Sequence, residues 1–506
     1  MSLERRTFLK GSAAAALVGG PFAGFANAPA SAVRKRPTFR DLVPIPDKRD
    51  GEVRLHLPEG FRYRSFHDTE FPVFLDDGTA LPGRHDGMGA FRGRRRGRGN
   101  DRGRRDKNVI LVRNHELNNP NLSAGETYEA FGPGTPYDSA ARGGTTTIEV
   151  TPYGEVVSAF TSLNGTMMNC SGGIMPWGSW VTCEETVNGP DVAPDFTGAS
   201  NVPLQKPHGY IFEVPADADP DDGQSNRAPI TRAGRFAHEA VSFDPEDGIL
   251  YLTEDNFGFP SGFYRYKPRR NPMHSGYLDN RGRLQMLAVK GRPNAHLEAN
   301  QPRNASYRVK WVDIDDPNEV YPYTPGQPAP TPHDTALVHV GAQGRAQGAA
   351  HFSRLEGQVY DDGVVYFTST QGGGPAETGP DNVGGYGNGS GQVWAYHTRS
   401  ERLSLVYQSP DRETLDFPDN VTTSPRGTLI LCEDNTNDNY LRGLSRNGKL
   451  WDICLNRVVS STGRDRSGDE FAGSAFSTDG DTLFVNIQAS AGMTFAIWGP
   501  WKSIGV

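Results

Sequence analysis

The sequence predicts an all-β protein, a six-bladed β-propeller with a metal cluster in its central channel. Two observations lead to this prediction. A hairpin-like segment recurs six times along the chain, and the residues between the copies show no helical periodicity. Each copy also begins with an acidic or thiol side chain, and a ring of such side chains suits bound cations.

Each copy has a polar anchor, a short strand, a Gly-containing turn and an apolar strand that runs toward a polar or acidic end. Alternating apolar residues and Asp-Gly turns are typical of β-hairpins. In chain order the copies are Asp86–Phe91 continued by Val109–Glu116, Asn169–Glu185, Glu239–Asn256, Glu356–Thr370, Asp419–Asn435 and Glu470–Asn486. Ordinary propeller blades repeat every ~40–50 residues, so insertions account for the longer spacing here.

A pair of β-sandwiches with coincidental Asp-Gly turns is the alternative architecture. The copies match through both strands and not only at the turns, which favours repeated β-meander units around a channel. We therefore expect one propeller domain over residues 33–506.

The first positions of the copies are expected to meet at one mouth of the channel, because the innermost strands of a propeller line it. These positions hold five carboxylates and one thiol: Asp86, Cys170, Glu239, Glu356, Asp419 and Glu470. Like charges at close range repel unless cations lie among them. The repeat alone therefore predicts bound metal.

Composition narrows the class of protein. The 506 residues include 60 Gly and 38 Pro, which suits many turns and long surface loops. The net charge of −8 gives no indication of nucleic-acid binding. No apolar run of 18 residues follows the N-terminus, so we expect no membrane span in the mature protein.

The first 32 residues have the pattern of a twin-arginine signal peptide. Arg5-Arg6 precede a short apolar run, and Ala26–Ala28 and Ala30–Ala32 both fit the small-residue cleavage rule. We expect export by the twin-arginine machinery to the periplasm or the extracellular space, with metals acquired before export.

Four cysteines remain after the signal peptide. Cys183 and Cys432 occupy the same place in two copies, inside apolar strands, where small buried residues are the ordinary interpretation. Cys170 begins its copy, where other copies have carboxylates, and this place indicates a metal ligand. A disulfide from Cys170 to Cys183 or Cys454 is the alternative that an oxidising compartment allows.

A basic low-complexity run interrupts the first hairpin between Arg92 and Lys107. Such a run can contact RNA or phosphate, but a disordered, solvated insertion is the interpretation we favour.

The segment Asn169–Glu185 resembles the PhoX-type alkaline phosphatase family, as do Arg235–Ala240, Arg354–Gly357, Asp419-Asn420 and Phe471–Gly473. The similarity runs from about Asp86 to Gln488, and its most specific part is the Asn-Cys-Ser-Gly-Gly to Thr-Cys-Glu-Glu segment. The Arg-rich insertion is outside the family pattern, and the chain is short for the family, so we expect loops that shape the substrate mouth to be missing.

The resemblance implies an exported metal-dependent phosphomonoesterase that acts on small phosphate esters, with Fe(III) and Ca(II) as cofactors. It implies Cys170 as an iron ligand and Glu185, Glu239 and Glu356 as glutamates that bridge the metals. It further implies Asp419 and Glu470 as acidic ligands and Arg354 as the side chain that binds substrate phosphate. We expect a monomer. His115 and His238 lie beside acidic residues and are expected to support ligands rather than to be ligands.

Two other functions use the same acidic channel. One is a calcium-dependent propeller hydrolase of another ester, such as a lactone, and the other is a non-catalytic exported propeller that binds a partner. Neither requires Cys170 or Arg354, so these two residues distinguish the phosphatase from its alternatives.

Overall fold

The structure is a computed structural model that describes residues 41–93, 108–122, 126–378 and 384–506. The twin-arginine segment and residues 94–107 of the basic insertion lie outside the described residues, so the predictions made for them stay predictions. No helix among the described residues is both long enough and apolar enough to cross a membrane.

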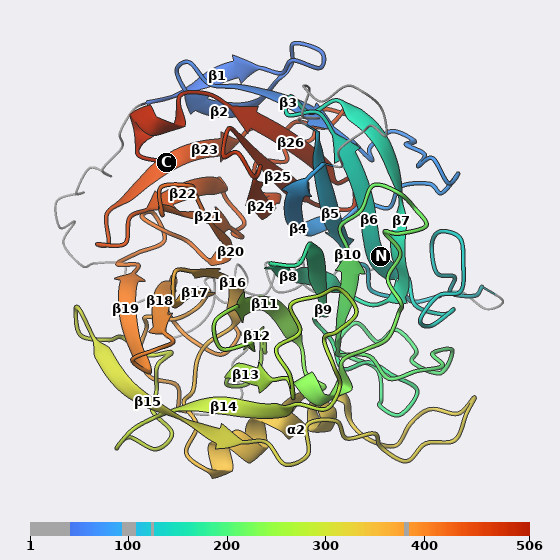
Figure 1. The fold of residues 1–506 in the computed structure, drawn as a ribbon, viewed down its shortest axis with the longest axis vertical. Helices are drawn as coiled ribbons and strands as arrows, with labels where there is room; N and C mark the ends of the chain where they lie inside the picture. The colour runs from blue at the N-terminus through green and yellow to red at the C-terminus, as the bar shows by residue number, and fades with distance from the viewer. Residues whose placement is uncertain (1–40, 94–107, 123–125, 379–383) are drawn as a thin grey trace, which may run out of the picture.

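The described chain consists mainly of β-strands grouped around a common centre, as in a propeller (Figure 1). Each of the six predicted copies forms an antiparallel strand pair. The pairs are β4 (His85–Arg92) with β5 (Val109–His115), β8 (Asn169–Met175) with β9 (Ser179–Glu184), β11 (His238–Asp244) with β12 (Ile249–Glu254), β16 (Leu355–Asp361) with β17 (Val364–Ser369), β20 (Pro418–Thr423) with β21 (Leu429–Glu433), and β24 (Glu470–Phe476) with β25 (Thr482–Gln488).

Further strands extend each pair outward. They are β6 (Gly143–Val150) and β7 (Val156–Thr166), β10 (Ile211–Pro215), β13 (Phe263–Lys267), β14 (Arg283–Val289) and β15 (Ser306–Asp313), β18 (Gln392–His397) and β19 (Arg402–Gln408), β22 (Tyr440–Leu444) and β23 (Leu450–Asn456), and β26 (Met493–Trp498). Strand β15 pairs with both β14 and β19, so two groups merge into one nine-stranded sheet. The buried apolar clusters contain residues of neighbouring groups, such as Val181 with Leu252 and Ile430 with Val485.

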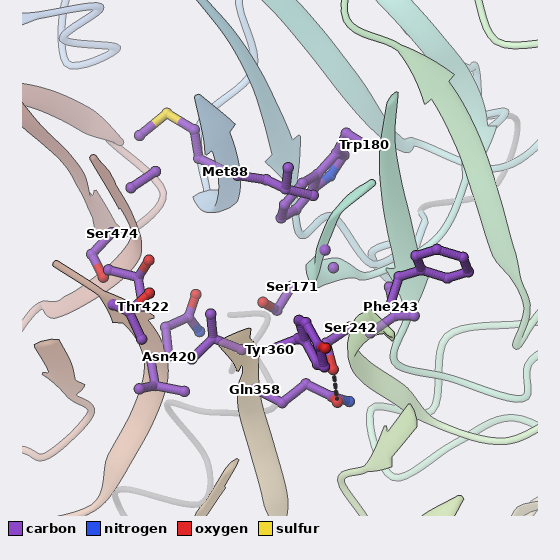
Figure 2. A pocket seen from close by; sticks show the side chains of 18 of the residues that line it. Met88, Ser171, Trp180, Ser242, Phe243, Gln358, Tyr360, Asn420, Thr422 and Ser474 are labelled. Carbon is purple, nitrogen blue, oxygen red and sulfur yellow. Dashed lines mark hydrogen bonds between the residues drawn. The ribbon is translucent and has the colours of Figure 1, made fainter. Parts of the chain in front are cut away.

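The first strands of the six pairs contact one another in a ring and surround a hollow of about 370 Å³ (Figure 2). Each of these strands contributes to the lining, through Met88, Ser171, Ser242, Gln358, Asn420 and Ser474 among others. Within the described residues no charged side chain lines this hollow.

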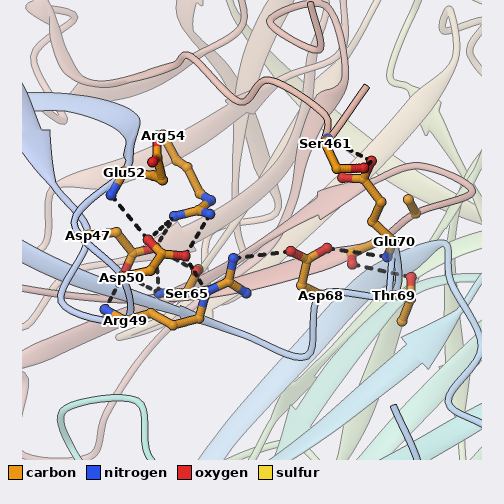
Figure 3. A network of polar contacts seen from close by, with 12 residues as sticks. Asp47, Arg49, Asp50, Glu52, Arg54, Ser65, Asp68, Thr69, Glu70 and Ser461 are labelled. Carbon is orange, nitrogen blue, oxygen red and sulfur yellow. Dashed lines mark hydrogen bonds and ion pairs between the residues drawn. The ribbon is translucent and has the colours of Figure 1, made fainter. Parts of the chain in front are cut away.

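The beginning and end of the described chain are joined by strand pairing. β3 (Arg62–Phe66) pairs with β26, and β2 (Val53–Pro58), itself paired with β1 (Leu42–Pro46), pairs with β23. A polar network holds this segment in place (Figure 3). Buried Asp47 accepts hydrogen bonds from Ser65 Oγ at 2.5 Å and from Arg54 Nη1 at 3.0 Å. Glu70 accepts one from the Ser461 backbone N–H at 2.8 Å, which connects the segment to the C-terminal part.

One helix departs from the sequence prediction, which contained none: α2 (His333–Ala346) packs against β14. Its buried face consists of Ala336, Leu337, Val340, Gly341 and Gly344. Most residues of this face are small, and histidine and glutamine lie between them in the sequence. The apolar periodicity of the segment is therefore weak. Gly344 leaves room for Met286 Sδ, which would lie 2.2 Å from an added Cβ.

Candidate metal centre

A β-bulge lies at the start of each of the first five innermost strands, where two residues face one residue of the partner strand. The first bulge residues are five of the predicted ligands: Asp86, Cys170, Glu239, Glu356 and Asp419. A bulge re-aims a side chain that regular pleating would direct elsewhere. The second bulge residue is small in several cases because the neighbouring strand approaches closely. At Gly357 an added Cβ would lie 2.6 Å from Asn420 Cα.

Strand β24 departs from this pattern, and the prediction that Glu470 occupies the equivalent position is wrong. Its bulge lies between Ala472 and Ala475, so Gly473 takes the place of the carboxylate, while Glu470 pairs with Gln488 at the start of the strand. The sequence comparison matched Glu470 to the first residues of the other copies because it is acidic. In the structure the equivalent position is set by the bulge, which lies three residues later at Gly473.

The structure nevertheless brings most predicted ligands together, in three buried groups whose candidate ligand atoms lie within 4.8 Å of one another. The groups are Cys170 with Glu185 and Glu239, Glu239 with Glu356 and Asp419, and Asp419 with Asp434 and Glu470. Glu239 and Asp419 are each shared by two groups, so the three groups form one continuous chain of ligands.

Asp86 is the predicted ligand that belongs to none of these groups. Its Oδ2 accepts a hydrogen bond from Gln488 Nε2 at 2.6 Å, and the same Nε2 donates to Glu116 Oε2 at 2.7 Å. Asp86 is nevertheless close enough to interact with the centre, because its negative charge helps to raise the pKa of the Cys170 thiol.

Burial and mutual repulsion disfavour the charged forms of Glu356 and Cys170 when no cation neutralises them. Burial, then Asp255 and Asp419, raise the pKa of Glu356 well above its usual range. Burial, then Glu239 and Glu185, do the same for the pKa of Cys170. A cation reverses this balance, since it favours the charged form of each ligand. Several carboxylates with one thiolate fit hard cations with a single softer contact, so the donor set suits metal ions.

Arg354 lies immediately before β16, in a left-handed backbone conformation with φ 40°. Its Nε and Nη2 donate to the two carboxylate oxygens of Asp255, at 3.2 and 2.9 Å, and Nη2 also donates to Glu356 Oε1 at 2.7 Å. Arg354 therefore lies beside Glu356, a member of the second ligand group. The backbone is not extended here, because the positive φ turns it at Arg354.

The sequence analysis did not predict Asp434, a member of the third ligand group, or Asp255, which binds Arg354. Each is the second acid of a doublet at the end of an apolar strand, as Glu185 is. The first acids have another task within their own sheets: Glu184 accepts from the Tyr210 backbone N–H at 3.1 Å, and Glu433 binds Arg442 at 2.9 Å. The doublets were visible in the repeat, and reading both acids would have found these residues.

The two histidines singled out from the sequence belong to no candidate ligand group. His115 Nδ1 lies 2.9 Å from Gly83 O, and His238 Nε2 lies 3.0 Å from Gly234 O. Burial lowers the pKa of each to about 3, so both are neutral and hold nearby backbone.

All four cysteines are buried free thiols, so the disulfide alternative for Cys170 is not observed. Cys183 and Cys432 lie in β9 and β21 opposite the bulges of their sheets, at matching places, as the repeat predicted. Only Cys170 belongs to a candidate ligand group among the described residues.

Comparison with known proteins gives a family match over most of the chain. The family model described as Alkaline phosphatase PhoX matches residues 41–157 and 155–491. No curated protein sequence matches.

Similar solved structures include Pseudomonas fluorescens PhoX in complex with vanadate, a transition state analogue. It has 18% identity and a TM-score of 0.62 over 91% of this chain and 98% of that chain. A gluconolactonase of Xanthomonas campestris has 11% identity and a TM-score of 0.36, over 86% of this chain and 97% of its own. At these identities the likeness concerns the fold, and only the first value is high enough to support it.

Proposed function

Since the chain belongs to the alkaline phosphatase PhoX family and is a phosphomonoesterase, we propose that it hydrolyses small phosphate esters with metal ions held by its three buried ligand groups. The observation that supports this most directly is the continuous chain of ligands from Cys170 to Glu470. Five of its members come from five different innermost strands, which supports a site at the mouth of a propeller channel.

The donor types suggest how the metals are distributed. The group with Cys170, Glu185 and Glu239 is the proposed Fe(III) site, because it contains the thiolate. The two all-carboxylate groups, which meet at Asp419, are the proposed Ca(II) sites. Bound cations would neutralise the phosphate and activate the attacking oxygen. Asp86 and Gln488 are proposed to hold the first bulge against the centre.

Arg354 is the proposed substrate-binding side chain. The two carboxylate oxygens of Asp255 accept hydrogen bonds from Nε and Nη2, and this bidentate contact fixes the plane of the guanidinium. Among the described residues Nη1 has no hydrogen-bond partner, so this donor is available for a phosphate oxygen of the substrate. A planar guanidinium in a fixed orientation stabilises the negative charge that develops on the transferring phosphoryl group.

The finer features of the fold and its setting also belong to the proposal. The nine-stranded sheet divides into two blades where β15 meets β19, which gives six blades in total. The twin-arginine pattern supports export of a folded, metal-loaded monomer to the periplasm or beyond. This route would supply the metals before the protein leaves the cytoplasm.

The test compares Cys170→Ser with Cys183→Ser, which is equally buried in the same core and belongs to no ligand group. Both proteins are exported by their native route, and iron, calcium and hydrolysis of p-nitrophenyl phosphate are measured. We expect Cys170→Ser to fold but to lose iron, any thiolate–iron absorption band and nearly all activity. Cys183→Ser should retain all three. Full iron content and turnover in Cys170→Ser would refute the assignment.

A further inference from the structure

A second feature is a basic hollow of about 580 Å³ on the third group of strands, β11 to β15. Six cationic side chains line it: Arg232, Arg265, Lys267, Arg269, Arg281 and Arg283. They come from a short helical turn (Thr231–Ala233), from β13 and the two residues after it, and from the first residue of β14 and the two residues before it. In a chain of net charge −8 this is a local excess of the opposite sign.

The hollow lies away from the metal centre. Thr253, two residues before Asp255, pairs with Phe263 at the beginning of β13. Lys267 is the last residue of that strand, and it pairs with Arg283, the first residue of β14. The basic side chains therefore gather at the opposite end of these strands from the one that leads into the centre.

The cations are placed where they repel one another. Lys267 and Arg283 are direct cross-strand partners, an arrangement that is destabilising for like charges. Arg265 projects on the same face, two residues from Lys267. Its orientation is fixed, because its guanidinium lies 4.6 Å from the centre of the Trp311 ring and its Nε donates to Gln285 Oε1 at 2.8 Å.

Nearby carboxylates neutralise only part of this charge. Asp313 lies 3.7 Å from Arg283, Asp279 lies 3.7 Å from Arg281, and Glu401 lies 3.9 Å from Arg265. These separations exceed hydrogen-bond distance. Asp247 also attracts Arg265, and Glu401 is shared with Lys290 outside the hollow. Six cations therefore face four carboxylates, and among the described residues Arg232, Lys267 and Arg269 form no ion pair. Positive charge thus remains in excess on this concave surface.

We propose that this hollow binds a compact polyanion, a small molecule that carries several phosphate or sulfate groups. Several separated cations match several anionic groups better than one phosphate ion. The open, concave shape, bordered by three chain segments, suits a compact ligand better than a flat anionic membrane or a nucleic-acid duplex. The binding neutralises the repulsion between Lys267 and Arg283, so the ligand also stabilises the third group of strands. This inference is independent of the phosphatase reaction.

The experiment titrates sucrose octasulfate into the metal-loaded chain by calorimetry, at two salt concentrations and with excess calcium to prevent loss of metal. The test variant is Lys267→Ser/Arg283→Ser. The control is Arg308→Ser/Lys310→Ser, which removes the same charge from two exposed residues of β15 outside the hollow. Melting temperature and hydrolysis of p-nitrophenyl phosphate are measured for each protein.

We expect the octasulfate to bind and to raise the melting temperature of the wild type and the control alike. The test variant should bind at least about tenfold more weakly, with a flatter salt dependence and unchanged hydrolysis. Equal binding by the test variant, or an equal loss in the control, would overturn the site. Inorganic phosphate that binds as tightly, or duplex DNA or anionic vesicles that bind more tightly through the same residues, would overturn the compact polyanion as its ligand.

Discussion

Arg354 offers the sharpest test of how this phosphatase works, because its two possible roles leave different signatures. In one role its guanidinium binds the substrate through Nη1. In the other it only neutralises the buried carboxylates of Asp255 and Glu356. The informative substitution is Arg354→Lys, which keeps the charge but removes the planar fork that contacts both carboxylates.

The structure sets the size of each effect. Arg354 makes three hydrogen bonds to two buried carboxylates, so Arg354→Ala leaves buried charge without its partner and should cost about 3–5 kcal/mol of unfolding free energy. Arg354→Lys keeps the charge, and we expect it to lose less. If Nη1 binds the transition state, both substitutions should lower kcat/KM by about 10²–10³, with lysine at the lower end.

The assay measures kcat/KM on p-nitrophenyl phosphate together with metal content and chemical unfolding. Arg442→Lys is the matched control, since Arg442 is also a buried arginine between two carboxylates, Glu433 and Asp452, and lies outside the proposed site. Arg354→Lys should lose activity at full metal content, while Arg442→Lys should lose only stability. Wild-type kcat/KM in Arg354→Lys, or an equal loss in Arg442→Lys, would refute a substrate-binding role.

Three further outcomes follow from the structure. Removal of calcium by exhaustive chelation should abolish activity and lower stability by about 3–4 kcal/mol, and an unchanged melting temperature would contradict the buried metal sites. Burial opposes a charged His208, yet Glu184 and Asp138 outweigh it and raise its pKa to about 9. The stability that protonated His208 contributes should be complete below pH 6.5 and should decline by about 3 kcal/mol as the pH rises through 9. Urea unfolding at several pH values measures this, and His208→Gln should flatten the profile. An equally steep profile in His208→Gln would contradict the raised pKa of His208. Asp47→Asn should lower the free energy of unfolding by about 2–3 kcal/mol, because it weakens the contacts that hold the N-terminal segment. Urea unfolding measures this loss. A loss below about 0.5 kcal/mol, the size of an ordinary surface substitution, would contradict this role.

The sequence predicted the hairpins and most of the ligand set because both follow the same repeat. A polar anchor and an apolar strand on either side of a turn specify local pairing, and pairing places the anchors at one end of each innermost strand. Cys170, Glu239, Glu356 and Asp419 were predicted in this way, and the structure brings them together. Their roles as ligands remain predictions that metal analysis will test.

What could not be predicted depended on contacts between elements. The helix α2 packs on β14 through small residues such as Gly344. Because these residues do not form a strong apolar stripe, the sequence pattern does not predict the helix. Asp434 and Asp255 are a different case, because the acidic doublets that contain them are visible in the sequence. The basic hollow depends on the pairing of Lys267 with Arg283, and these residues lie on two strands whose register the sequence does not give.

Glu470 shows why a repeat in sequence need not be a repeat in space. At the bulge of β24 the equivalent residue is Gly473, with φ 59°, and an added Cβ there would lie 2.2 Å from Asp86 O. A carboxylate in this place would force the first and last innermost strands apart. The acid lies instead at the start of its strand, where its ligand atom is within 4.8 Å of those of Asp434 and Asp419. Close packing where the ring closes thus excludes a ligand at the sixth bulge, and the centre is a chain of three groups instead of a symmetric ring.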